Sequence, residues 1–345
     1  FKALEKITVE GEVLDASGQL VTDFTGIVNP TVKDSKVTVT CLKNSNKDDS
    51  PAFTFTDYPN TIFIGNDSVR NGKFSFTFTV PKDISYSNLQ GKMNLYAVDT
   101  ESGNEAQGNF DNFIVGGTSD TAETDTIGPE IRALYLNDTT FVDGGQVNTT
   151  PYFVAELWDK SGVNITGSSV GHDMMLVIDE STVLSYNLNS YYELLLGEDG
   201  TGIVKFPIPA LEPGKHTAEF WVWDILNNST VRTFTFEVVE GLKPFLFDVI
   251  ATPGIAREQV TFHLMHNRPE SRMRVGIMVY DLAGRQLWKH EESGTSGLFE
   301  NYTVSWDLTS GGARMRPGVY IYRAAISTDN SKDATKARKF IILGE

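Results

Sequence analysis

The sequence predicts an all-β protein built from three consecutive immunoglobulin-like antiparallel β-sandwich domains. Short segments of alternating apolar and polar residues recur along the chain, and turn-forming residues separate them. The sequence contains no amphipathic pattern long enough for a helix of more than two turns. At 345 residues the chain exceeds what one hydrophobic core usually serves. We therefore expect two or three domains.

Alternation is clearest at residues 73–80, where Phe and Val side chains face one way and polar side chains the other. This pattern is typical of a half-buried antiparallel strand. Similar patterns occur at residues 232–238, 260–264 and 302–306. Turn signals lie between such segments, among them Asn71-Gly72, Asp143-Gly144-Gly145 and Glu212-Pro213-Gly214.

Two changes of composition divide the chain. A small, polar and acidic stretch predicts an extended linker, and a turn-rich stretch near Pro244 marks a second boundary. The expected division is a first domain at 1–117, a linker at 118–125, an acidic domain at 126–240 and a last domain at 243–345.

Charge is distributed unevenly. The net charge is −5 over residues 1–118, −14 over residues 119–241 and +3 over residues 242–345. The acidic middle argues against nucleic acid as a partner, because phosphates need a cationic surface. The sequence also lacks a run of about 18 apolar residues, so we expect no membrane-spanning helix.

The sequence offers no catalytic constellation. Cys41 alternates with polar residues as a strand residue would, which favours a small core residue over a nucleophile. None of the five histidines forms the paired spacing of a zinc enzyme. The most site-like trio is Gly171-His172-Asp173, but neighbouring strand residues point to opposite faces. We therefore predict no catalytic residue and no enzyme activity in this segment.

Structural calcium is the one cofactor that the sequence suggests. Asp159 and Asp224 each end a predicted strand and precede oxygen-rich turn residues. Calcium takes about six to eight oxygen ligands, which such turns can supply. Asp and Asn also stabilise turns by bonding their own backbone, with no ion involved. Both interpretations stay open.

Five blocks near the C-terminus carry a family resemblance: Val279–Leu287, Trp306–Leu308, Gly311-Gly312, Pro317–Arg323 and Ala337–Leu343. They resemble the C-terminal sorting domain of proteins secreted by the type IX system of the Bacteroidetes. One departure is Thr252-Pro253-Gly254, where ordinary cargo usually has Pro-Asn-Pro.

Further blocks lie along the rest of the chain: Val80–Tyr86, Asp159–Asn164, Gly171–Asp173, Tyr186–Tyr192, Trp223–Asn228, His266–Pro269 and Met315–Gly318. Together they resemble the gingipain-like sortases of the same secretion system. The resemblance covers nearly all of the chain.

The resemblance implies a cysteine peptidase that is peripheral to the bacterial outer membrane at the cell surface. Such an enzyme removes sorting domains from secreted cargo and joins the cargo to anionic lipopolysaccharide. Its catalytic domain, which meets the cargo sorting domains, is expected before Phe1. This segment would be non-catalytic and would dock on an outer-membrane β-barrel protein of the attachment complex.

Four residues are candidates for docking. Arg314 and Arg316 lie in the Gly-rich turn, and the planar guanidinium group suits interfaces. Phe340 and Ile342 lie in the last predicted strand, whose edge would offer backbone groups to a partner.

Two other functions stay open. An ordinary type IX cargo protein, such as an adhesin or a hydrolase, would carry the same sorting domain. A carbohydrate-binding β-sandwich would stack sugars on Tyr191, Tyr192, Trp221 and Trp223. Alternating aromatic residues in strands more often belong to the core.

Overall fold

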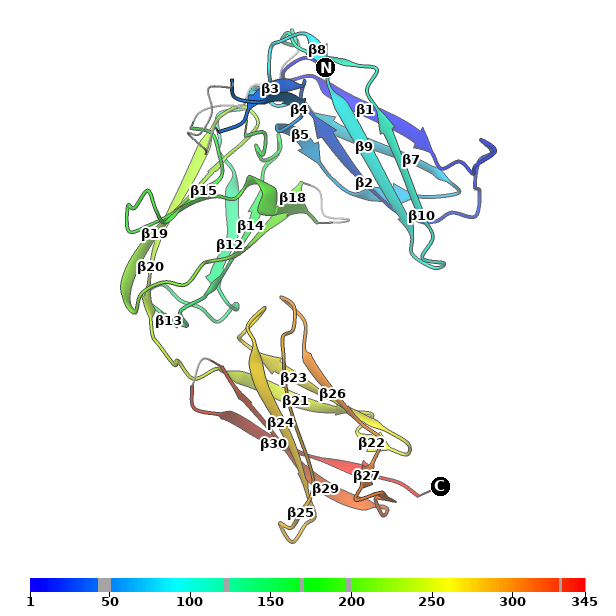
Figure 1. Cartoon of the computed structure of the whole chain (residues 1–345), viewed down its shortest axis with the longest axis vertical. Coiled ribbons are helices and arrows are strands. Elements are labelled where there is room, and N and C mark those ends of the chain that lie inside the picture. The colour runs from blue at the N-terminus through cyan, green and yellow to red at the C-terminus, as the bar shows by residue number, and fades with distance from the viewer. Residues whose placement is uncertain (43–50, 121–124, 168–170, 196–199, 329–330, 345) are drawn as a thin grey trace. The chain divides into compact units, whose positions relative to one another are not determined.

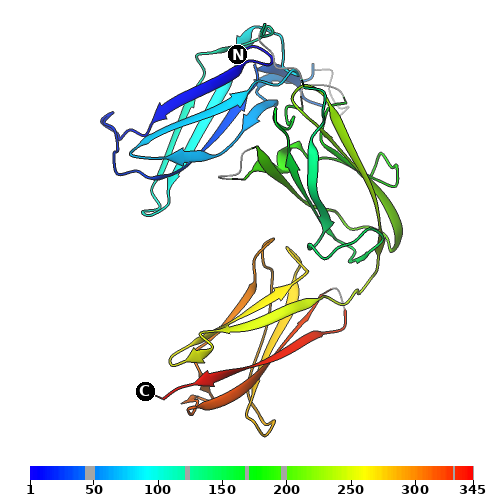
Figure 2. The same cartoon turned by 180° about the vertical axis from the view of Figure 1, so that it is seen from behind.

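The computed structural model describes residues 1–42, 51–120, 125–167, 171–195, 200–328 and 331–344. Two opposite views show these residues as strands joined by turns and loops (Figures 1 and 2). Within these ranges the one helical element is a 3₁₀ turn, η1 (Asn189–Tyr191). The predicted all-β, antiparallel class is confirmed.

The chain forms two compact units. Unit 1 consists of Phe1–Leu134, Ala155–Lys205 and Thr217–Phe234, and unit 2 of Tyr135–Val154, Phe206–His216 and Thr235–Glu345. The division passes through five strands: β12 (Glu130–Leu136), β14 (Tyr152–Trp158), β18 (Thr201–Pro207), β19 (Gly214–Trp223) and β20 (Ser229–Val238). The three-domain division remains a prediction.

The first strands of unit 1 are β1 (Lys6–Glu12), β2 (Gly26–Lys33), β3 (Val37–Thr40), β4 (Thr54–Asp57), β5 (Thr61–Ile64), β6 (Asp67–Val69), β7 (Lys73–Thr79), β8 (Leu89–Gln90), β9 (Lys92–Asp99), β10 (Glu105–Phe110) and β11 (Ile114–Val115). One sheet has the order β10-β9-β2-β5, with β6 also on β2, and β1 pairs with β7. Their buried apolar residues form one core between Ala3 and Val115.

Strand β7 shows why this sequence folds as predicted. Phe74, Phe76 and Phe78 are buried while Ser75 and Thr77 are exposed, as the alternation requires. The Phe76 ring lies 6.4 Å from that of Phe74 and 6.2 Å from that of Phe78. Each buried Phe contributes roughly 1.5–3 kcal/mol relative to an exposed one.

Unit 1 also holds β15 (Met175–Ile178), β16 (Ser185–Asn187) and β17 (Tyr192–Leu194). Antiparallel ladders join β15 to β16 and to β19, and β17 to β18. In unit 2 the short β13 (Gln146–Val147) pairs with β20 in parallel.

The C-terminal strands of unit 2 are β21 (Leu246–Thr252), β22 (Ile255–Ala256), β23 (Val260–His266), β24 (Met273–Tyr280), β25 (Gln286–Gly294), β26 (Tyr302–Trp306), β27 (Thr309–Ser310), β28 (Ala313–Arg314), β29 (Gly318–Ser327) and β30 (Ala334–Ile342). They form sheets ordered β21-β23-β26 and β22-β30-β29-β24-β25. Their side chains build one core between Leu246 and Ile342, in which Trp306 stacks on Trp288 at 4.5 Å.

The expectation that Cys41 is a core residue is wrong. Cys41 follows β3 and is exposed. Among the described residues, β3 pairs with β4 alone in a two-stranded ribbon, and every residue of β4 is exposed. Apolar and polar residues alternate in β3, but its two-stranded ribbon does not bury Cys41.

Candidate functional site

Three carboxylates meet in unit 1. Asp159 follows β14, Asp224 follows β19, and Asp125 comes from the predicted linker. One oxygen atom of each lies within 4.8 Å of the others. Asp159 is 5% exposed and Asp224 is fully buried. The structure thus unites both predicted calcium ligands with a third residue that the sequence did not indicate.

Local turns hold the two buried aspartates. The Oδ1 atom of Asp159 accepts from the backbone N–H groups of Ser161 (2.8 Å) and Gly162 (2.9 Å). The Oδ1 atom of Asp224 accepts from the backbone N–H of Asn228 at 2.7 Å. These are the turn-stabilising bonds that Asp forms with its own backbone. They use the Oδ1 atom of each carboxylate.

Asp125 joins the cluster through tertiary bonds. Its Oδ2 atom accepts from the Ser161 hydroxyl at 2.8 Å, and its backbone oxygen accepts from Asn228 Nδ2 at 3.1 Å. The same Asn228 amide donates to Asp224 Oδ2 at 2.6 Å. Nothing in the linker's composition distinguishes Asp125 from its acidic neighbours, so only the fold reveals it.

Burial governs the electrostatics of the cluster. It raises the pKa of Asp159 to about 6, with a further contribution from the charges of Asp224 and Asp125. Burial also raises the pKa of Asp224. Hydrogen bonds from the Ile127 backbone and the Ser161 side chain keep the pKa of Asp125 below its usual range. A hard cation bound by these oxygens would relieve the repulsion, so the donor set fits calcium.

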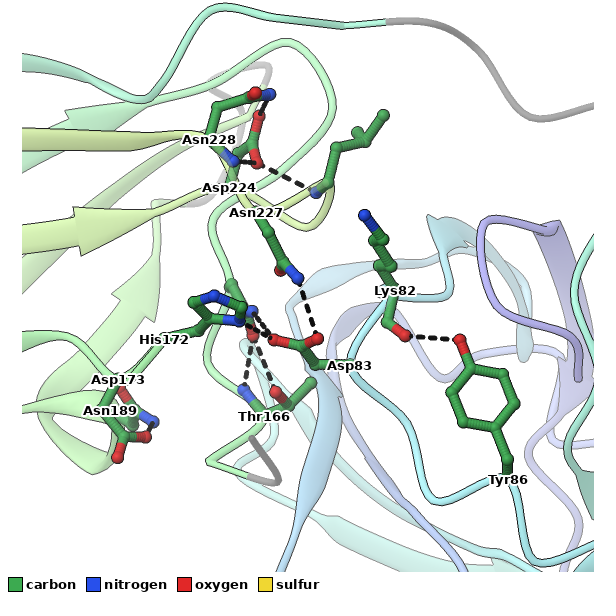
Figure 3. Close-up of polar contacts among 12 residues, drawn as sticks. Lys82, Asp83, Tyr86, Thr166, His172, Asp173, Asn189, Asp224, Asn227 and Asn228 are labelled. Carbon is green, nitrogen blue, oxygen red and sulfur yellow. Dashed lines mark hydrogen bonds and ion pairs between the residues drawn. The ribbon is translucent and has the colours of Figure 1, made fainter. Parts of the chain in front are cut away.

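A second polar cluster surrounds Asp83 (Figure 3). Its carboxylate lies 2.6 Å from His172 Nδ1 and accepts from Asn227 Nδ2 at 2.9 Å and Asn164 Nδ2 at 3.3 Å. Next to it, the backbone N–H of Lys82 donates to the Ile225 carbonyl at 2.8 Å. One loop after β7 is thereby bound to three loops of residues 155–234 within unit 1.

His172 and Asp173 do not act as a pair. His172 contacts Asp83 and the Trp223 ring, 4.5 Å away, whereas Asp173 accepts from Asn189 Nδ2 at 2.8 Å. Their separation was expected from strand alternation, but both residues lie in the loop before β15. The contacts of His172 indicate a structural role.

The predicted docking residues divide into two kinds. Arg314 and Arg316 are exposed, and a guanidinium nitrogen of Arg314 donates to the Arg257 carbonyl. Phe340 and Ile342 are each 1% exposed and belong to the core. Any docking by β30 would therefore use its backbone. Strand β22 pairs with its residues Ile341 and Ile342 only.

The aromatic residues considered for sugar binding are also divided. Tyr192 is 6% exposed, Trp223 packs on His172, and Trp221 Nε1 donates to Glu219 at 3.3 Å. Tyr191 is 41% exposed. The four rings thus differ in burial and do not share one exposed face.

Neither a scan with protein-family models nor a search of curated proteins found a match. Among solved structures, PorU from Porphyromonas gingivalis, crystallised in a dimeric latent form, is 38% identical over 100% of this chain. The chain is related to a segment of PorU. It spans 32% of the PorU chain, and the TM-score is 0.41.

Two more distant matches are the Ig1-2 module of the Drosophila receptor tyrosine phosphatase DLAR and Bacteroides ovatus SGBP-B. The first is 10% identical, covers 63% of this chain and 98% of that one, and has a TM-score of 0.24. The second, solved with a mixed-linkage heptasaccharide, is 9% identical, covers 98% and 64%, and has a TM-score of 0.27. Neither bears on the function of this chain.

Among the described residues, no helix has the length and apolar character needed to cross a bilayer.

Proposed function

We propose that this chain is the non-catalytic part of a bacterial cell-surface sortase of the gingipain-like cysteine peptidase class. The observation that carries the proposal is the 38% identity to PorU over the whole chain. The parent enzyme would remove sorting domains from type IX cargo and attach the cargo to anionic lipopolysaccharide. Its catalytic domain would precede Phe1 and would be the part that meets the cargo.

Within this proposal the two ends of the chain have different roles. Residues 1–240 position the enzyme, and residues 243–345 dock it on an outer-membrane β-barrel protein of the attachment complex. The docking role is supported by the net charge of +3 over residues 242–345 and by the exposure of Arg314 and Arg316. The enzyme would then sit at the cell surface, peripheral to the outer membrane.

Deletion of residues 243–345 from the parent protein tests the docking role. We expect the truncated enzyme to leave the cell surface and appear in the medium. Circular dichroism of the released protein must show that the remaining strands are folded. Unchanged surface retention would refute docking by this segment, and cleavage before Lys243 during export would instead indicate an ordinary cargo protein.

The assignment also implies that the isolated chain lacks peptidase activity. Incubation with a protein ending in a type IX sorting domain should give no cleavage. Cys41→Ala is the matched variant, since Cys41 is the single cysteine. Cleavage that this variant abolishes would contradict the assignment.

A further inference from the structure

A cavity among the described residues of unit 1 has a volume of about 810 Å³. Ligand sites typically occupy about 300–1,000 Å³. Residues 76–79 of β7, residues 62–64 of β5, and Tyr192 with Leu194 of β17 line it, together with residues of β1, β2 and β6. Four consecutive residues of β7 contribute, so its edge, and not one of its faces, meets the cavity.

The backbone pattern of β7 shows which groups point to that edge. Val80 donates its N–H to the Glu5 carbonyl, and Val13 donates to the Gly72 carbonyl, in the same register as β1–β7. Hydrogen-bonded and non-hydrogen-bonded pairs alternate along an antiparallel ladder. The odd-numbered residues of β7 therefore direct N–H and C=O away from β1.

The turn before β7 confirms this direction. Lys73, the first odd-numbered residue, exchanges backbone hydrogen bonds with Arg70 on the side away from β1. Strand β6 then pairs with β2, in the other sheet. Beyond Lys73, β7 pairs with β1 alone among the described residues. Thr77 and Thr79 thus present backbone groups to the cavity.

The opposite walls are sheet edges as well. Strands β5 and β17 each lie at the end of their sheets. The Leu194 carbonyl of β17 accepts from Asn66 Nδ2 at 2.6 Å, which shows that β17 faces the β5–β6 turn. On this wall the half-buried Phe63 ring stacks on the buried Phe76 and Phe78, 4.7 Å from the ring of Phe78.

The charges around the cavity nearly balance. Three basic residues, Lys6, Arg70 and Lys160, line it together with the acidic Asp67 and Asp159. A strongly charged ligand would find no matching field there. Unpaired strand edges beside an apolar wall match an extended peptide, whose donors and acceptors repeat at the spacing of a strand.

We propose that this cavity binds an extended, largely uncharged peptide segment of another polypeptide, which adds to β7 as an antiparallel or parallel strand. Thr77 and Thr79 provide the main-chain bonds, and alternate apolar side chains of the peptide face the half-buried Phe63 and Leu194. Only the source of the peptide rests on the proposed function. In that function the peptide would be a stretch of cargo next to the sorting domain.

The test uses the whole 345-residue chain. A phage library of random dodecapeptides is selected on the wild-type chain, and the most enriched peptide is synthesised. Thr77→Pro removes the outward N–H without removing a backbone bond to β1, since Pro is tolerated where a strand N–H faces away from its sheet. It also removes the Thr77 hydroxyl, which lies 2.9 Å from that of Thr8 in β1, and Thr77→Val removes the same hydroxyl. We expect an affinity about tenfold lower, from the lost hydrogen bond and the added ring.

Two controls separate binding from folding. Thr77→Val keeps the N–H and should bind within about threefold of wild type, since its backbone is unchanged. Ser75→Pro makes the same change at an outward position that does not line the cavity, and should also bind as wild type. Hydrogen exchange on the wild-type chain needs no variant: bound peptide should slow exchange at Thr77 and Thr79.

The proposal is overturned if no peptide is enriched, if the peptide binds Thr77→Pro as tightly as wild type, or if neither amide is protected. These outcomes leave the proposed function intact, because surface docking is tested by deletion of residues 243–345 and not by peptide binding.

Discussion

Asp83 gathers donors from three separate loops of unit 1 onto one carboxylate. Its side chain is 11% exposed and that of His172 is 28% exposed. Hydrogen bonds to a charged group in such a setting contribute more than those between neutral groups on the surface. Asp83 is therefore expected to stabilise unit 1 measurably.

A double-mutant cycle tests this expectation. Asp83→Ala and His172→Ala, singly and together, should show a coupling energy of about 1–2 kcal/mol in urea unfolding. The matched control is the pair His290 and Glu292 in unit 2, which are 2.8 Å apart but 40% and 38% exposed. Its coupling should stay below about 1 kcal/mol. Equal couplings for the two pairs would argue against a special role for Asp83.

Asp159 predicts an unusual pH dependence of stability. Its pKa is about 6 in the folded chain, above the usual Asp value of about 3.9 in an unfolded one. Between these values the folded state binds more protons, so the free energy of unfolding falls as pH rises. The contribution is fully present below about pH 4 and lost above about pH 6, and it amounts to roughly 3 kcal/mol at most.

Asp159→Asn should flatten that part of the curve in calcium-free buffer, measured by urea unfolding from pH 4 to pH 7. Asp23→Asn, at an exposed aspartate of the same unit, is the control and should leave the slope unchanged. A wild-type slope that persists in Asp159→Asn would assign the effect to another group.

Calcium should act in the opposite direction. Binding to the folded chain alone stabilises it by about 2.7 kcal/mol at a hundredfold excess over Kd. We expect millimolar calcium to raise the melting temperature at pH 7, and Asp159→Asn or Asp224→Asn to lose that response. If the wild-type chain melts at the same temperature in calcium and in chelator, the aspartates only stabilise their turns and do not bind calcium.

At the scale of elements, most strands follow from local pattern. Residues 73–80 were predicted as a strand and form β7 at Lys73–Thr79. The alternation at residues 302–306 likewise corresponds to β26. Cys41 and Asp125 were misplaced or missed, because the burial of a ribbon and the path of a linker depend on distant residues. No local pattern reports such contacts.

Gly202 shows a tertiary requirement within a strand. A Cβ atom at this position in β18 would lie 2.3 Å from the Tyr192 ring, and Tyr192 is 6% exposed. Gly202→Ala should destabilise unit 1 by about 1–3 kcal/mol through overpacking. The melting temperature of this variant reports the effect.

Gly108→Ala is the matched control for that change. Gly108 lies in β10, and a Cβ atom there meets no atom within 4 Å. Its replacement should be neutral or stabilising by up to about 1 kcal/mol, because Ala restricts the unfolded chain more than Gly. Equal losses at both positions would mean that the Tyr192 contact does not matter.

At the scale of the whole molecule, charge separates the ends of the chain. The net charge is −16, yet residues 242–345 carry +3. Such a contrast favours attachment of the C-terminal part to an acidic surface while the rest stays in solvent. In the proposed docking, the exposed arginines beside the β27–β28 turn would make the contact, since Phe340 and Ile342 are enclosed in the core.

Arg314→Glu combined with Arg316→Glu in the parent protein should reduce its retention in the outer-membrane fraction. The loss should be larger at about 0.05 M salt than at about 0.5 M, because salt screens the charge contribution that the change removes. The control for net charge is Arg272→Glu, at an exposed arginine outside this turn, and this variant should stay in the outer-membrane fraction.

A different outcome would place the contact elsewhere: the doubly substituted protein is retained at both salt concentrations, while deletion of residues 243–345 releases the protein. The backbone of β30 before Ile341 would then be the first place to test, because β22 does not pair with that part of the strand.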